Sequence, residues 1–146
     1  MEYSKITIVD EDDTLVGYET YDKAIEQHLI RRTCCIYIVD EEGNHLIQKR
    51  SMHISKPGKL DKAVGGHVDQ GESYKETAVR EIQEEIGLVG LELVEIATSF
   101  RTSEFFQAVY KATIPRNTII NFDPHEIESM LWMSTSEIDT HVKCLT

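Results

Sequence analysis

Three glutamates set close together are the residues of this sequence most able to do chemistry. Glu81 is followed by Glu84 and Glu85, at intervals of three and four residues. On a helix, like charges at these spacings repel by roughly 0.2–0.5 kcal/mol. A divalent cation would reverse that repulsion, and carboxylate oxygens are ligands that Mg²⁺ and Mn²⁺ prefer. We interpret the three glutamates as a metal-binding platform; the alternative is an ordinary acidic face exposed to solvent.

A helix over residues 73–86 is predicted to carry these glutamates. Ser73, with Glu76 three residues later, matches a capping box, and Gly87 stands where a left-handed cap would end the helix. At about 100° per residue, one side of this helix should pack and the other should present the glutamates. The packing side is expected to hold Val79, Ile82 and Ile86, and the glutamate side to include Tyr74 and Ala78.

A glycine-rich segment, residues 65–71 (GGHVDQG), precedes this helix and follows a predicted strand at 60–64. Gly65, Gly66 and Gly71 permit positive φ angles and a close approach of the backbone to a ligand. We therefore expect a tight loop that brings backbone groups up to the metal.

Together these residues form the pattern G-x5-E-x7-R-E-U-x-E-E-x-G-U, in which U is aliphatic. The pattern resembles the complete signature of the Nudix hydrolase family. The positions that carry the resemblance are Gly66, Glu72, Arg80, Glu81, Ile82, Glu84, Glu85, Gly87 and Leu88. The resemblance implies an α/β (α+β mixed) fold, the Nudix α/β/α sandwich with a mixed central sheet between helices, as a single domain over residues 1–146.

The resemblance also implies roles for individual residues, with Mg²⁺ or Mn²⁺ as the cofactor. Glu81 and Glu85 would be the principal metal ligands, and Glu84 a further or water-mediated one. The carbonyl of Gly65 would complete the metal site. Glu72 and Arg80 would form an ion pair that contacts the glutamates and orients them without binding the metal.

Segments that precede the signature or overlap its start resemble the subgroup of Nudix proteins related to type I isopentenyl-diphosphate isomerase. They read ITIVDEDDTLVGYET, HLIRRTCCIYIVDEEGNHLIQKRS and KPGKLDKAVGGHVDQGES. In the isomerase, a cysteine that does acid/base chemistry on the alkene stands where this chain has Gly65. Ala24 and Arg31 stand where the isomerase has metal-binding histidines, whereas the histidine of the isomerase is retained at His67. Because the site rather than the scaffold decides the chemistry, we interpret the chain as a hydrolase on an isomerase-like scaffold.

The expected reaction is attack of water on a phosphorus of a nucleoside diphosphate linked to another moiety. Metal ions would neutralise charge on the phosphate oxygens and activate the water. For the general base the resemblance implies Glu126, six residues before Trp132, because related sequences commonly carry a glutamate at this position; Glu128 and Glu104 are in reserve. The alternative for Glu126 is a solvated carboxylate at the start of a helix. A non-catalytic nucleotide-binding domain is the rival function, but no glutamate of the signature is lost.

Positive charge is concentrated just before the glycine-rich segment. Residues 49–62 contain one acid, Asp61, and the five cations Lys49, Arg50, Lys56, Lys59 and Lys62. We predict an electropositive lip that steers an anionic substrate toward the glutamates; the alternative is a set of ordinary solvated loop residues. The predicted substrate-binding residues are Arg50, Lys56, Lys59 and Lys62.

The 146-residue chain has a net charge of −11, which argues against tight binding of long nucleic acid or of an anionic membrane. No apolar run is long enough to span a bilayer, and residues 1–5 lack the features of a signal peptide. Cys34, Cys35 and Cys144 are odd in number and lack metal-site spacing, which favours a reducing compartment. We therefore expect a cytoplasmic protein, a monomer or a homodimer, with Cys34 and Cys35 packed in a buried strand.

The remaining periodicities predict further elements on both sides of the signature. Strands are expected at 6–10, 15–18, 89–99 and 104–113 and through 130–132, and a hairpin at 33–39 and 45–49 across the turn 41–44. Helices are expected near 21–29 and after Ser134, and a loop at 114–124.

Overall fold

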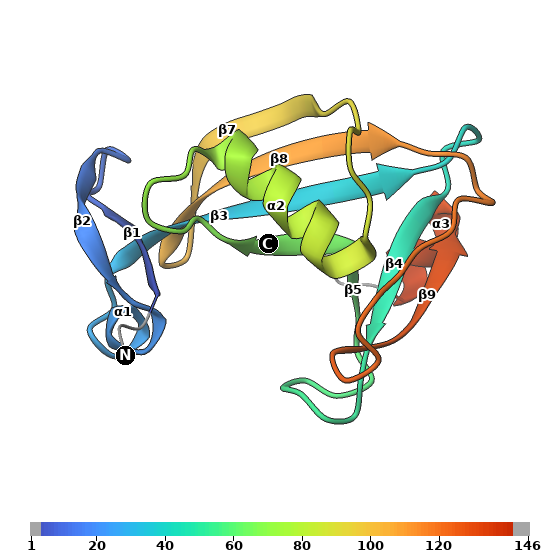
Figure 1. The fold of residues 1–146 in the computed structure, drawn as a ribbon, viewed down its shortest axis with the longest axis horizontal. Helices are drawn as coiled ribbons and strands as arrows, with labels where there is room; N and C mark the ends of the chain where they lie inside the picture. Colours follow the sequence, from blue (N-terminus) through green and yellow to red (C-terminus); the bar gives the residue numbers. More distant parts are fainter. Residues whose placement is uncertain (1–3, 142–146) are drawn as a thin grey trace.

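β3 (Ile30–Val39) is the strand around which the sheet is arranged. It is rich in Ile, Val, Thr and Tyr, which favour strands. In the computed structural model, which describes residues 4–141, one edge of β3 pairs antiparallel with β1 (Lys5–Val9), β6 (Val64–His67) and β4 (His45–Arg50) (Figure 1). The other edge pairs parallel with β8 (Phe105–Thr113). Segments that are far apart in the sequence thus meet along one strand.

The other strands extend this sheet. β2 (Leu15–Thr20) pairs with β1, and β7 (Val94–Thr102) pairs with β8. β5 (Leu60–Lys62) and β9 (Ile127–Met133) both pair with β4. The nine strands of the described residues therefore belong to one mixed sheet. The helices are α1 (Tyr21–Glu26), α2 (Tyr74–Ile86) and α3 (Thr135–His141).

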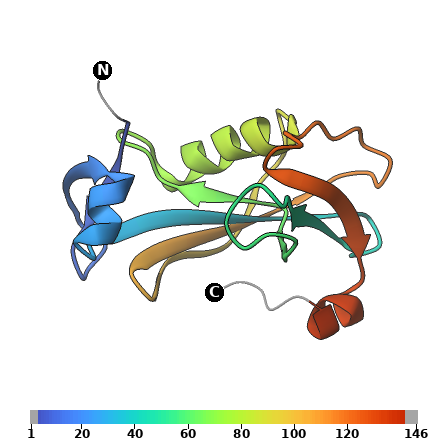
Figure 2. The same cartoon turned by 90° about the horizontal axis from the view of Figure 1, so that it is seen from below.

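α2 and α3 pack on opposite faces of the sheet. Leu46 and Ile47 are consecutive in β4, so their side chains point to opposite faces. Leu46 belongs to the main core with Ile82 of α2, whereas Ile47 packs with Met133 and with Ile138 of α3. Figure 2 shows α2 above the sheet and α3 below it. The predicted mixed sheet between helices is confirmed.

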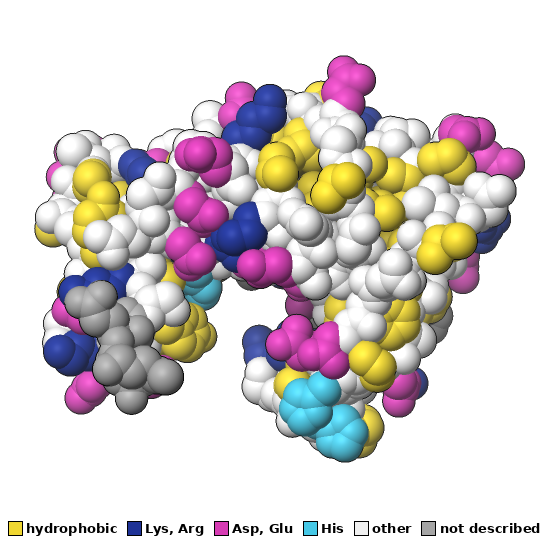
Figure 3. Space-filling view, viewed as in Figure 1, with side chains coloured by type: hydrophobic (Ala, Val, Ile, Leu, Met, Phe, Trp, Pro, Cys, Tyr) yellow, Lys and Arg dark blue, Asp and Glu magenta, His cyan; other side chains and the backbone are white. Residues whose placement is uncertain are grey.

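A deep notch divides one side of the molecule (Figure 3). β1, β2 and α1 form what we call the N-terminal lobe, in which Ile6 and Ile8 pack against Ala24. β4, β5, β9 and their connecting loops lie across the notch (Figure 1). β6 pairs with the middle of β3, between the sites of β1 and β4. This register places β6 at the head of the notch.

Several predicted boundaries are confirmed, and two are shifted. The strands at 6–10, 15–18, 104–113 and through 130–132, the loop at 114–124 and the helix after Ser134 are present. The strand predicted at 89–99 begins only at Val94, because Gly87 and Gly90 have φ angles of 71° and 74°. The helix predicted at 21–29 ends at Glu26, because His28 has a φ of 54°. No helix within residues 4–141 combines the length and apolar character needed to cross a membrane.

The predicted hairpin at 33–39 and 45–49 is wrong beyond its turn. β3 and β4 pair only at Val39 and His45 and then diverge. β3 takes β6 and β8 as neighbours, and β4 takes β5 and β9. For the same reason the strand predicted at 60–64 is divided at Ala63 into β5 and β6. Long-range pairing overrides the local turn.

Candidate active site

Helix α2 begins and ends where the sequence predicts. The Ser73 hydroxyl accepts a hydrogen bond from the Glu76 N–H at 3.1 Å, and the Glu76 carboxylate accepts one from the Ser73 N–H at 2.9 Å. Gly87 adopts a left-handed conformation, with a φ of 71°, and ends the helix. The predicted capping box and C-cap are confirmed, so the helix that carries the glutamates has two fixed ends.

The side of α2 that faces the sheet agrees only in part with the predicted one, since Ile82 and Ile86 are buried as predicted. Val79, expected in the core, is 47% exposed, whereas Ala78, expected beside the glutamates, is fully buried. The side chain of Glu81 is 14% exposed, against 59% for Glu84. Glu81 and Glu85 follow Ala78 by three and seven positions and therefore lie on its side of the helix. Two glutamates thus lie at the margin of the packed face, not opposite to it.

The expected loop at 65–71 is wrong in its first half, because Gly65 and Gly66 belong to β6. Of the three glycines in this segment, only Gly71 has a positive φ, of 86°. The other two allow close approach instead. A Cβ on Gly66 would lie 2.5 Å from Glu81 Oε1, and the Gly65 N–H donates to Glu85 Oε2 at 3.1 Å. Backbone and carboxylates therefore meet at β6, as the sequence predicts.

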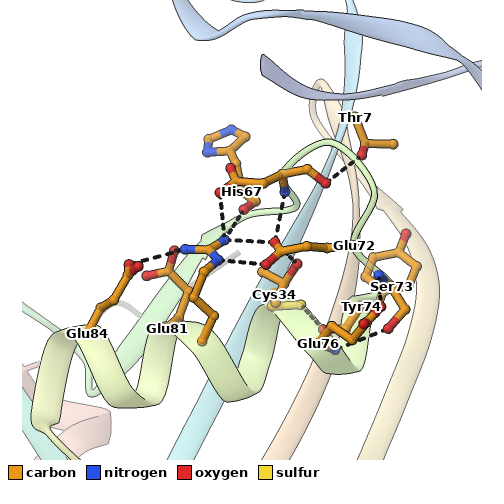
Figure 4. Close-up of polar contacts among 12 residues, drawn as sticks. Thr7, Cys34, His67, Glu72, Ser73, Tyr74, Glu76, Glu81 and Glu84 are labelled. Carbon is orange, nitrogen blue, oxygen red and sulfur yellow. Dashed lines mark hydrogen bonds and ion pairs between the residues drawn. The ribbon is translucent and has the colours of Figure 1, made fainter. Parts of the chain in front are cut away.

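The Arg80 guanidinium connects the charged groups on the α2 side of β6, and Figure 4 shows Glu72, Glu81 and Glu84 turned toward it. Nε and Nη2 donate to Glu72 at 2.8 and 3.0 Å. Nη1 donates to Glu81 at 2.6 Å and to Glu84 at 3.2 Å, and Nη2 reaches the His67 carbonyl at 3.3 Å. The bidentate contact with Arg80 holds the pKa of Glu72 below its usual value. Arg80 fixes β6 and two of the three glutamates relative to one another.

Glu81 and Glu85 form an acidic pair next to β6. Burial, followed by the hydrogen bond and charge of Glu81, raises the pKa of Glu85. Within residues 4–141 no three acidic, histidine or cysteine side chains form a ready-made metal-binding group. Arg80 holds Glu81 and Glu84 instead. The donor set nevertheless fits a hard cation, because a divalent ion at the pair would offset both the burial of the Glu85 carboxylate and its repulsion by Glu81.

A pocket of about 340 Å³ adjoins the acidic pair. It brings together five predicted site residues from distant parts of the chain, namely Arg50, Lys62, Gly65, Glu85 and Glu126. The rest of its lining is Gln48, Ile54, Asp61 and Ile127. The other predicted site residues do not line this pocket. They are Lys56, Lys59, Glu72, Arg80, Glu81 and Glu84.

This combination of an acidic helix, a close-packed glycine strand and a mixed sheet has a counterpart among known proteins. The family model described as NUDIX domain matches residues 29–144. The chain belongs to the Nudix family. It is a Nudix hydrolase, and Nudix hydrolases act on small nucleotide-type substrates and generally use divalent metal ions.

Individual Nudix relatives cover most of the chain. An uncharacterised Nudix hydrolase of Yersinia pestis is 31% identical over 137 residues, which are 91% of this chain and 74% of that protein. The isopentenyl-diphosphate Delta-isomerase of Serratia proteamaculans is 30% identical over 115 residues, which are 78% of this chain and 59% of the isomerase. The crystal structure of DR0079 from Deinococcus radiodurans has a TM-score of 0.79 and 26% identity, and the match covers 92% of this chain and 85% of that one.

The positions compared with the isomerase, three that depart from its pattern and His67, which retains it, can now be placed in the structure. Ala24 is fully buried in the N-terminal lobe. Arg31 is buried and donates to the Leu29 carbonyl at 3.2 Å. Burial, with a contribution from the charge of Arg31, lowers the pKa of His67 to about 4, so its imidazole is neutral at neutral pH. A Cβ on Gly65 would lie 3.0 Å from the backbone carbonyl of Cys34, which leaves little room for a cysteine there.

The cations of residues 49–62 do not lie together. Lys56 and Lys59 are exposed and outside the pocket, and Lys49 pairs with Glu128 at 2.8 Å. Glu104, the other reserve base, contacts His28 at 2.5 Å and is also outside the pocket. The two reserve carboxylates are therefore engaged elsewhere.

The two cations inside the pocket share an acidic partner. Asp61 lies 3.4 Å from Lys62 Nζ and 4.0 Å from Arg50 Nη1. Arg50 also donates from Nε to the Ser55 carbonyl at 2.8 Å and thereby holds its own loop. Lys62 lies against Gly65, since a Cβ on that glycine would be 2.3 Å from Lys62 Cε. The sequence marks Asp61 only as the single acid of the segment and gives no sign of this role.

Sequence reasoning also missed the residue that joins the two loops of the pocket. Ser51 is buried, its N–H donates to the Glu126 carbonyl at 3.0 Å, and its hydroxyl donates to the His125 carbonyl. The imidazoles of His53 and His125 stack beside this contact, with centroids 5.1 Å apart. No spacing signal could reveal it, because the partners are more than seventy residues apart.

The cysteines within the described residues are free and buried, as predicted. Burial, with a contribution from the neighbouring thiol, raises the pKa of Cys34 to about 12. Burial likewise raises the pKa of Cys35 to about 11. Neither thiol is poised for acid/base chemistry at neutral pH. Cys144 lies outside the described residues.

Proposed function

We propose that this Nudix hydrolase cleaves the phosphoanhydride bond of a nucleoside diphosphate linked to another moiety, with Mg²⁺ or Mn²⁺ as cofactor. One observation carries the proposal: Glu85, Gly65 and Glu126 meet in one pocket with the two cations Arg50 and Lys62. Acidic groups suit a metal ion and cations suit phosphate oxygens. A diphosphate is the kind of ligand that uses both.

We assign the metal to the acidic pair and to the backbone beside it. The proposed ligands are the Gly65 carbonyl, Glu81, Glu84 and Glu85. When bound, the ion would neutralise charge on the phosphate oxygens and lower the pKa of a bound water. Arg80 and Glu72 are proposed as positioning residues, which the contacts of Arg80 with Glu72, Glu81 and Glu84 support. Lys62 and Arg50 would bind the phosphates.

We propose Glu126 as the general base. It shares the pocket with Glu85, and its backbone is fixed by the Ser51 N–H. Its side chain is exposed and free to approach a water molecule. Glu126 does not begin a helix, because residues 124–126 form a turn that leads into β9; the alternative that remains is an exposed carboxylate without a catalytic role.

The similarity to the isomerase supports an isomerase-like scaffold but not its reaction. Gly65 offers no proton donor, and the raised pKa values of Cys34 and Cys35 leave neither thiol able to replace one. The rival function, nucleotide binding without turnover, would be favoured by the loss of a glutamate of the signature. All three glutamates of the platform are present and two of them meet at β6.

A panel of substrates tests the proposal. It should contain nucleoside diphosphates and triphosphates, nucleotide sugars, dinucleoside polyphosphates and isoprenoid diphosphates, each with Mg²⁺ and Mn²⁺. We expect metal-dependent release of phosphate or of a nucleoside monophosphate. Glu126→Gln should lower kcat by about 10²-fold or more, whereas Glu128→Gln, the matched control, should keep wild-type turnover. Conversion of isopentenyl diphosphate to dimethylallyl diphosphate, or no turnover of any member, would contradict the proposal.

The proposed setting is a single domain over residues 1–146 in the cytoplasm. The free, buried state of Cys34 and Cys35 supports a reducing compartment. We propose a monomer or a homodimer, which the mass in solution distinguishes.

A further inference from the structure

The N-terminal lobe presents an aromatic ring to the notch that the proposed reaction does not yet use. Tyr21, the first residue of α1, is 51% exposed. Its ring packs edge-on against His67 at the end of β6, with centroids 5.1 Å apart and planes at 80°. Figure 3 shows histidine and hydrophobic side chains on this wall of the notch. One side of the ring is therefore supported and much of the rest is open.

The strand β6 relates this ring to the proposed phosphate site. Gly65 and His67 are two residues apart, so they face the same way and lie about 7 Å apart along the strand. This is the face away from α2, because Val64, whose side chain points the other way, lies in the core with α2. Lys62 lies against Gly65 on this face, and Tyr21 lies against His67. The Lys62 ammonium, Gly65 and the Tyr21 ring therefore follow one another along this face of β6.

The lobe that carries Tyr21 is fixed to the segment that carries the metal site. The Thr7 N–H of β1 donates to the Val68 carbonyl at 2.9 Å, just after β6. At the other end of the lobe, the Asp13 carboxylate accepts from the Tyr74 hydroxyl of α2 at 2.8 Å. α1 itself is anchored by Ala24. The ring is thus held in place before any ligand binds, which reduces the entropy lost on binding.

We propose that Tyr21 binds the nucleobase of the substrate by stacking, and so makes the enzyme select diphosphates that carry a base. This inference rests on the proposed function, because it takes the phosphates to lie between Lys62 and the acidic pair. A ribose would then span the stretch of β6 from Gly65 to His67. Every base has a flat π face, so stacking on one ring discriminates base-bearing from base-free ligands without choosing among bases.

Binding of a monophosphate tests this inference independently of hydrolysis. AMP has no phosphoanhydride bond, and ribose 5-phosphate is the same molecule without the base. Calorimetric Kd values with Mg²⁺ should show that Tyr21→Leu weakens AMP binding by about tenfold or more. The same substitution should leave the Kd of ribose 5-phosphate within about twofold, and Tyr21→Phe, which keeps the stacking face, should bind AMP as the wild type does.

Tyr18→Leu is the matched control. Tyr18 is an exposed tyrosine of the same lobe, but it pairs with Thr7, between the two β1 residues that pack on α1, and therefore faces away from α1. It should bind AMP with the wild-type Kd. Unchanged AMP binding in Tyr21→Leu, or wild-type protein that binds AMP no better than ribose 5-phosphate, would overturn the proposal. If Tyr21→Leu does not fold, the ring resonances of Tyr21 in the wild-type NMR spectrum decide: they should shift with AMP, and unshifted resonances would overturn the proposal.

Discussion

On the α2 side of β6, charged groups are held by a single residue of the same helix, whereas the two pocket cations of residues 49–62 are brought together by the pairing of two strands. Arg80 contacts Glu81 and Glu84 within one turn of helix. Lys62 and Arg50 lie in the pocket with Asp61 because β5 pairs with β4. Spacing along a helix determines which side chains lie next to one another, whereas spacing along a loop does not. The acidic region therefore follows from sequence, and the basic region does not.

The largest effect is expected at the acidic pair. Glu85→Gln keeps the shape of the side chain but removes an anionic ligand, so kcat should fall by about 10²-fold or more for any substrate found. Folding should survive, because the substitution also removes a carboxylate that is partly buried beside Glu81. Steady-state kinetics and thermal unfolding of purified protein provide the check. Wild-type turnover in Glu85→Gln would contradict the assignment of Glu85 as a metal ligand.

Arg80→Lys tests whether the acidic region depends on geometry or only on charge. Lysine keeps the positive charge but cannot make the bidentate contact with Glu72 while also reaching Glu81. Loss of such supporting contacts typically costs about 10–100-fold in metal affinity or activity, and we expect kcat to fall within that range. The metal concentration at half-maximal activity should rise as well. If Arg80→Lys behaves as the wild type, charge alone suffices.

The basic region should separate into one lysine that acts by contact and two that act at a distance. Lys62→Gln should raise KM several-fold at low and high salt, because Lys62 lies in the pocket against Gly65. The double variant Lys56→Gln with Lys59→Gln should lower kcat/KM by no more than about twofold, and only at low salt. Exposed charges are screened beyond about 10 Å at 0.1 M ionic strength. Equal losses of kcat/KM in both variants, independent of salt, would contradict this separation of Lys62 from Lys56 and Lys59.

The smallest effect on turnover is expected from modification of the thiols of Cys34 and Cys35. Cys34 lies on the α2 side, where its thiol contacts the Tyr74 carbonyl at 3.0 Å, and Cys35 lies on the other face of β3. Their pKa values, raised to about 12 and about 11, leave little thiolate at pH 8. In a Cys144→Ser background, iodoacetamide should modify the native protein slowly and leave turnover intact, as followed by mass spectrometry. Rapid loss of activity would show that a thiol participates.

The order of elements and the ends of α2 could be predicted because their signals are local. Ser73, Glu76 and Gly87 specify a helix through contacts with their own neighbours. The packed side of that helix was predicted in part: Ile82 and Ile86 are buried, but the place of Val79 is taken by Ala78. Glu81 is drawn to the sheet side by its approach to Gly66 and by Arg80, and Val79 is left outside.

Parts of the site that depend on distant pairing could not be predicted. Ser51, Asp61 and Tyr21 carry no motif, and their positions follow from contacts with residues from other parts of the sheet. Glu126 was predicted from its distance to Trp132 and does lie in the pocket, where Ile127 pairs with Arg50 across β9 and β4. Its role as base stays a prediction until Glu126→Gln is measured.

Metal binding without substrate tests the central claim most directly. Titration of Mn²⁺, followed by the electron paramagnetic resonance signal of the free ion, gives a Kd for the wild type, Glu81→Gln, Glu85→Gln and Glu126→Gln. We expect the first two substitutions to weaken binding by about tenfold or more. Glu126→Gln should bind Mn²⁺ as the wild type does, because Glu126 is proposed as the base rather than a ligand. Equal Kd values for wild type, Glu81→Gln and Glu85→Gln would contradict the account, because the acidic pair would then hold no metal.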